Sequence, residues 1–144
     1  MTRENKGHYA KKHPSDRKMD ENIAEAVKKR ISGGKISCAA AFKIVSDLKV
    51  PPAEVGFTID SLEIPITKCQ LGLFGYNPQK KFIKPADSIP STLEEAIHQA
   101  LVNSRLSCAA AWDIAERFGL GKMEVTSACE ALGVKISSCQ LGTF

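Results

Sequence analysis

Among the residue types that could form a reactive or metal-binding site, the cysteines have the most suggestive spacing in this chain. Cys38 and Cys108 each follow a serine placed to cap a helix, and the helix dipole there favours a thiolate. Cys69 and Cys139 recur at equivalent positions near the end of a short predicted strand. Such pairs would suit a redox switch or a soft-metal site. We favour buried, reduced thiols, because free cysteine is among the most buried residue types and the neighbours are apolar.

Catalytic chemistry has little else to use in this sequence. The three histidines are His8, His13 and His98, and no serine, histidine and acid arrangement accompanies them. A glycine-rich phosphate loop and a paired-carboxylate pattern are also missing from the sequence. We therefore expect no enzyme activity, no cofactor and no metal.

Charge is distributed unevenly along the 144 residues, which carry a net charge of +4. Residues 1–19 hold six basic and two acidic side chains, so the rest of the chain is neutral. This segment is polar and is expected to be a flexible basic arm. The sequence contains no run of about 20 apolar residues and no secretory signal pattern, so we expect a cytoplasmic protein without a membrane partner.

A tandem repeat positions the residues described so far. Residues 37–74 and 107–144 match at a constant offset of 70 without insertion or deletion, from Ser-Cys-Ala-Ala-Ala to Cys-Gln-Leu-Gly-x-Phe. Most replacements between the copies keep size and polarity, so both copies should bury the same faces. Cys129 replaces Ile59 of the first copy, which predicts that Cys129 fills a core.

Each copy predicts three helices followed by a short strand. Apolar spacing of three and four residues predicts the helices, and alternation after the third helix predicts the strand. We expect a mainly α fold of two tandem modules, packed as a pseudo-two-fold pair with the strands as the seam. The predicted segments are the arm 1–19, the first module 20–75, the linker 76–90 and the second module 91–144.

The second and third helices of the second copy resemble the helix-turn-helix superfamily of DNA-binding proteins. Small Ala115 stands where two helices cross, Gly119 at the turn, and Val125 where it packs back on the alanine. Ile114, Phe118 and Ala128 would fill the remaining core positions. The first copy departs from the pattern at Val45 and Lys49. The Cys-Gln-Leu-Gly-x-Phe ending is similar to an ending of uncharacterised prokaryotic proteins, and the whole implies a winged-helix-like fold.

This resemblance implies that the third helix reads double-stranded DNA in a major groove. In the second copy its outward side chains would be Lys122, Met123, Thr126 and Ser127. The basic arm and the linker would add phosphate contacts. The contributing linker residues are Lys80, Lys81 and Lys84.

A protein-interaction adaptor is the alternative function. The third helix of the first copy offers Ala53, Gly56 and Phe57, which suit a protein groove better than DNA. The sequence therefore favours a DNA-binding transcriptional regulator, and an adaptor that binds a protein partner is the alternative. A thiol or metal sensor is a third class of function. The sequence leaves open whether the chain forms a homodimer.

Overall fold

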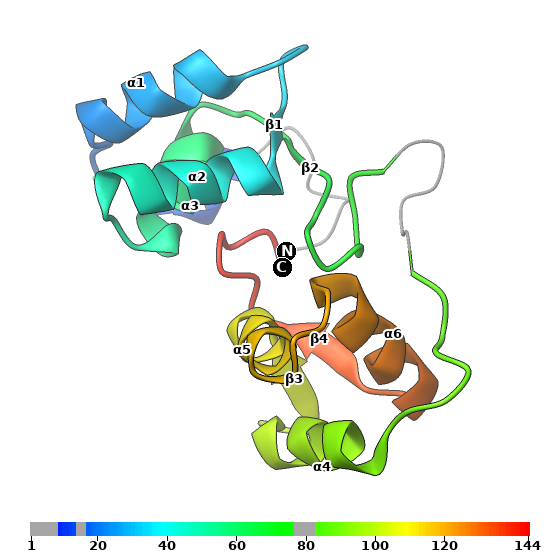
Figure 1. The fold of residues 1–144 in the computed structure, drawn as a ribbon. Helices are drawn as coiled ribbons and strands as arrows, with labels where there is room; N and C mark the ends of the chain where they lie inside the picture. The colour runs from blue at the N-terminus through cyan, green and yellow to red at the C-terminus, as the bar shows by residue number, and fades with distance from the viewer. Residues whose placement is uncertain (1–8, 14–16, 77–82) are drawn as a thin grey trace. The chain divides into compact units, whose positions relative to one another are not determined.

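The structure is a computed structural model that describes residues 9–13, 17–76 and 83–144. The fold is mainly helical with short strands, as the sequence predicts. The elements of the first repeat and of the segment before it lie in the first half of the chain (Figure 1). They are η2 (Tyr9–Lys12), α1 (Glu21–Arg30), β1 (Ile36–Ser37), α2 (Cys38–Leu48), α3 (Pro52–Ser61) and β2 (Ile66–Thr67).

The second repeat has the same order of elements (Figure 1). They are α4 (Ser91–Ala100), β3 (Arg105–Ser107), α5 (Cys108–Phe118), α6 (Lys122–Leu132) and β4 (Lys135–Ser137). Among the described residues, no helix has both the length and the apolar character needed to cross a membrane.

Two compact units divide the chain at positions that the repeat alone does not indicate. The first unit contains the described residues up to Cys69 together with Gln140–Phe144, and the second contains Gln70–Cys139. Each unit therefore includes the last residues of the other repeat. These bounds differ from the predicted modules 20–75 and 91–144 at the repeat endings, and the pseudo-two-fold packing of the modules stays a prediction.

Helix capping explains where the second helix of each repeat begins. The Ser37 hydroxyl accepts the Ala40 N–H at 3.1 Å, and the Ser107 hydroxyl accepts the Ala110 N–H at 3.1 Å. Each bond satisfies a backbone donor that the first helical turn leaves without a partner. The small residues that follow allow close packing, and Ala111 is fully buried.

The short strands pair inside each repeat. β1 runs parallel to β2, with Ile36 opposite Ile66, and β3 runs parallel to β4, with Leu106 opposite Ile136. Among the described residues, the strands of one repeat therefore do not pair with those of the other. The sequence analysis missed β1 and β3, because two or three residues beside a helix cap are too few for an alternating pattern to show.

The core of each unit gathers the apolar faces of its three helices. Ile23, Val27 and Ile44 are buried in the first unit, and Ile97 and Ile114 in the second. The residues predicted to sit at the helix crossing also lie inside, since Ala115, Val125 and Ala128 are buried. Phe118 was predicted as a core residue and is instead 37% exposed, because it ends α5 beside the turn.

The turn after the second helix differs between the repeats in one informative residue. Gly119 follows α5 with φ 65°, and Lys49 follows α2 with φ 54°, so both occupy the left-handed region. A side chain in this region costs about 1 kcal/mol. We expect Lys49→Gly to raise the free energy of unfolding of the first unit by about 1 kcal/mol, less the entropy that glycine adds to the unfolded chain. Urea denaturation measures this change in the free energy of unfolding. The reverse substitution, Gly119→Lys, should lower the stability of the second unit. A change of the same sign in both variants would contradict the explanation.

Candidate functional site

The third helix is the element from which the sequence predicts function, and in the first unit most of it is buried. All six residues from Val55 to Asp60 are buried. α1, α2 and η2 all contact α3. A major groove needs a helix face that is open along its length. The described part of the first unit offers no such face on α3.

The N-terminal segment holds α3 through its backbone and through one histidine. The N–H groups of Tyr9 and Ala10 donate to the Glu63 carboxylate at 2.9 and 3.1 Å. His13 Nε2 lies 2.8 Å from Asp60 Oδ2. The residues from Tyr9 to His13 therefore contact the end of α3, although the sequence predicts them to be part of a flexible arm. The two carboxylates at the end of α3 and the buried Tyr9 ring supply the contacts that the composition of the arm did not reveal.

The predicted protein anchor Phe57 is covered by the same segment. Its ring meets the His13 ring edge-on, with centroids 4.9 Å apart, and the Arg17 guanidinium carbon lies 3.9 Å from its centroid. Arg17 also pairs with Glu54 at 2.7 Å. Phe57 is 3% exposed and Gly56 is buried, while Ala53 is exposed. The three residues do not form one accessible apolar face.

The predicted DNA-reading residues of α6 lie in different environments. The Lys122 ammonium lies 4.5 Å from the centroid of the Trp112 ring, and Met123 is half-buried. Thr126 is 1% exposed, and its hydroxyl donates to the Lys122 carbonyl at 3.3 Å. The Ser127 carbonyl accepts the Ala86 N–H at 3.0 Å. The buried Thr126 side chain therefore cannot reach a base edge.

The predicted phosphate contacts are described only in part. Lys84 is exposed. Lys80 and Lys81 lie outside the described residues. Lys84 is therefore the one residue of this set whose surroundings the structure describes.

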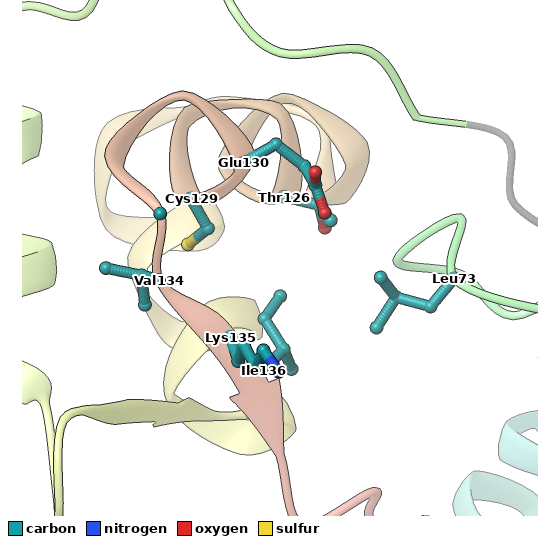
Figure 2. Close-up of a pocket in the computed structure, with 8 residues that line it drawn as sticks. Leu73, Thr126, Cys129, Glu130, Val134, Lys135 and Ile136 are labelled. Carbon is teal, nitrogen blue, oxygen red and sulfur yellow. The ribbon is translucent and has the colours of Figure 1, made fainter. Parts of the chain in front are cut away.

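A hollow of about 430 Å³ opens beside α6 in the second unit. Figure 2 shows Thr126 and Glu130 on the helix, Lys135 and Ile136 on the strand, and Leu73 facing them from a separate segment. Cys129, Gly133 and Val134 complete the lining. The wall thus combines apolar and polar surface, and it carries one carboxylate and one ammonium. The sequence analysis missed this hollow, because Leu73 and α6 are far apart in the chain.

The cysteines carry thiols and not disulfides, and four of them are buried: Cys38, Cys69, Cys108 and Cys129. Burial raises the pKa of the Cys129 thiol to about 11, and the neighbouring Glu130 carboxylate adds to the rise. Within the described ranges, no group of three or more histidine, cysteine or acidic side chains is arranged to hold a metal ion. The burial of Cys129 agrees with its predicted place in the core.

Thiol accessibility separates a structural role of the cysteines from a sensing role. Cys139 is half-buried, whereas the other four thiols lie inside the units. Alkylation requires an accessible thiolate. We expect iodoacetamide to label Cys139 first in the native protein and the other four only after unfolding, as followed by mass spectrometry of the peptides. Fast native labelling of Cys38 or Cys108 would contradict this expectation and revive the sensor.

Comparison of the chain with protein-family models, with curated proteins and with solved structures finds no significant match. Within the chain, the two repeats place equivalent positions of α3 and α6 in different surroundings.

Proposed function

We propose that the chain is a cytoplasmic protein-interaction adaptor, and that the hollow beside α6 receives a segment of a partner protein. One observation carries this proposal. In the first unit, the end of α3 contacts a segment of the chain itself, and in the second unit the matching end of α6 borders a hollow of about 430 Å³ lined by described residues.

Equivalent positions support the comparison between the two faces. At the repeat offset of 70, Asp60 corresponds to Glu130 and Glu63 corresponds to Gly133. Asp60 and Glu63 hold the N-terminal segment in the first unit. Glu130 and Gly133 line the hollow in the second. The first unit therefore provides an example of how this face of the module accepts a peptide.

The lining indicates the chemistry of the partner segment. Leu73, Val134 and Ile136 offer apolar surface to an aromatic or aliphatic side chain. Glu130 stands where Asp60 pairs with His13, so it favours a basic side chain a few residues away. The expected ligand is a segment with an aromatic residue followed by a basic one. Tyr9 and His13 show this pattern in the first unit.

The accessibility of the third helices favours this function over base reading. In α3 the residues from Val55 to Asp60 are buried, and in α6 Thr126 and Cys129 are buried. Base recognition needs several polar side chains projecting from one open helix face. A peptide in the hollow needs only the end of α6 and the strand that follows it.

A labelled peptide provides the test. The probe is a fluorescent peptide of residues 8–17, which carries both Tyr9 and His13, titrated into the full chain. We expect saturable binding by fluorescence anisotropy and shifted amide resonances at Thr126, Cys129 and Glu130. Loss of a charge-assisted contact should weaken binding about tenfold in Glu130→Lys.

The matched control changes an acidic residue on the same helix outside the hollow. Glu124 is exposed and does not line the hollow, so Glu124→Lys should bind the peptide as the unchanged protein does. Equal weakening by both substitutions would reduce the interaction to general electrostatics. Absence of binding, or shifts confined to α3, would overturn the proposed site.

DNA binding is the second candidate, and a specific cluster favours it. Exposed basic residues gather at the end of α1 and in the turn that follows: Lys28, Lys29, Arg30 and Lys35. Binding to random-sequence duplex DNA at two salt concentrations tests this cluster, because phosphate contacts make the affinity salt-dependent. Salt-sensitive binding that is lost in a Lys28→Glu, Lys29→Glu variant would support a DNA-binding regulator. No binding by the unchanged chain would leave the adaptor as the proposed function.

A further inference from the structure

The ending of the second repeat contributes to the first unit. Gln140–Phe144 belongs to the compact unit that contains α1, α2 and α3, although Cys139 belongs to the second unit. Leu141 is 2% exposed within this segment. These five residues thus belong to the first unit, whereas the preceding residues of the second repeat belong to the second unit.

The contact between this segment and α3 is a close backbone approach. A Cβ atom placed on Gly56 would lie 2.0 Å from the Leu141 carbonyl oxygen and 2.7 Å from its carbonyl carbon. Real Cβ atoms do not come this close to backbone atoms, and a backbone cannot move aside as a flexible side chain can. Only glycine at position 56 therefore permits this seat for Leu141.

The second unit receives the ending of the first repeat in a corresponding exchange. Gln70 begins that unit, and Leu71 and Phe74 are 1% and 6% exposed. Thr126 occupies the position that corresponds to Gly56. The steric requirement for glycine is therefore particular to the first unit.

We propose that the α3 face around Gly56 is a docking site for the segment Gln140–Phe144, and that a second copy of the chain can supply this segment. Two chains that each donate the segment to the other form a closed exchange, which reuses an existing contact and needs no new surface. Within one chain the segment is present at an effective concentration of about 1 mM. Exchange between chains is therefore expected when docking within the chain is blocked.

Two complementary variants of the full chain test the exchange. Gly56→Ala closes the docking site and leaves the segment intact, and it also favours the helix itself. Leu141→Asp disables the segment by placing a charge where a leucine is buried, and it leaves the docking site intact. Each variant alone should sediment as a monomer of about 15.6 kDa. The mixture should form a one-to-one complex of twice that mass when each chain is present at about 0.1 mM. This chain concentration is lower than the effective concentration of a segment linked within one chain.

Matched controls separate docking from general effects of substitution. Gly121→Ala adds a methyl group that would meet only Glu124 side-chain atoms, at 3.6 Å or more. In this variant the segment Gln140–Phe144 should therefore stay bound to α3 of its own chain. Gly121→Ala mixed with Leu141→Asp should therefore stay monomeric. A mixture of Gly56→Ala and Leu141→Asp that also stays monomeric overturns the proposal.

Peptide binding tests the docking site in chains that keep Gly56. The probe is a fluorescent peptide of residues 137–144, added to the Leu141→Asp chain and to the unchanged chain. The peptide should bind the Leu141→Asp chain at least tenfold more tightly, because the seated segment of the unchanged chain competes with it. Equal affinity for the two chains, or no binding to either, would overturn the docking site.

Discussion

Phe57→Ala is expected to lower the free energy of unfolding of the first unit by about 3 to 4 kcal/mol, whereas Phe118→Ala changes the second unit by less than about 1 kcal/mol. The two positions carry the same residue type in different surroundings. Phe57 is 3% exposed and contacts the His13 ring and the Arg17 guanidinium. Phe118 is 37% exposed, and the guanidinium carbon of Arg117 lies 5.9 Å from the centroid of the Phe118 ring.

The loss at Phe57 has two physical sources. Removing a buried aromatic ring forfeits its transfer free energy and leaves a cavity that the surroundings fill only in part. It also removes the surface to which His13 and Arg17 attach, so the N-terminal segment loses part of its hold on α3. We therefore expect faster trypsin cleavage after Arg17 in Phe57→Ala, together with the loss of stability.

Native-state hydrogen exchange measures both units in one experiment. Protection of α3 amides should fall in Phe57→Ala, while protection of α6 amides should stay as in the unchanged protein, because α6 belongs to the other compact unit. Unchanged protection of α3 would mean that Phe57 is held loosely and is available to a partner. That outcome would restore the sequence-based interpretation of Phe57 as an anchor for another protein.

The repeat was sufficient to predict the local structure of each half of the chain. Serine caps, small residues after the cap and apolar spacing are local signals, and they placed the second helix of both repeats. The same reasoning located the turn residue Gly119 and the buried Ala115. It failed at Phe118, since a pattern of spacing does not reveal where a helix face leaves the core.

The candidate sites could not be predicted in the same way, because they depend on contacts between distant segments. Nothing in the composition of residues 1–19 shows that Glu63 and Asp60 will bind them. The exchanged endings also carry the same motif in both repeats, so the sequence does not show which unit each completes. One signal was available. A glycine inside a predicted helix, with threonine at the matching position, indicates a close approach by another backbone.

Alkaline pH should destabilise the second unit through Cys129. Burial raises the pKa of this thiol from 9.0, its ordinary value, to about 11 in the folded protein. The folded state therefore holds a proton that the unfolded state releases between these two values. Stability from this group is complete below about pH 9 and falls as the pH rises toward about 11, with a loss on the order of 2 kcal/mol.

Urea denaturation of the second unit at several pH values between about 8 and 11 measures this loss. The Trp112 fluorescence reports on this unit, since Trp112 belongs to it. Cys129→Ala is the matched variant, because it removes the titrating group and keeps the lysines and tyrosines that titrate in the same range. Its stability should be lower at neutral pH, through the lost side-chain volume, but should fall less steeply with pH. Parallel pH profiles of the two proteins would show that the Cys129 thiol does not titrate with a raised pKa, and that the wall of the hollow is open to water.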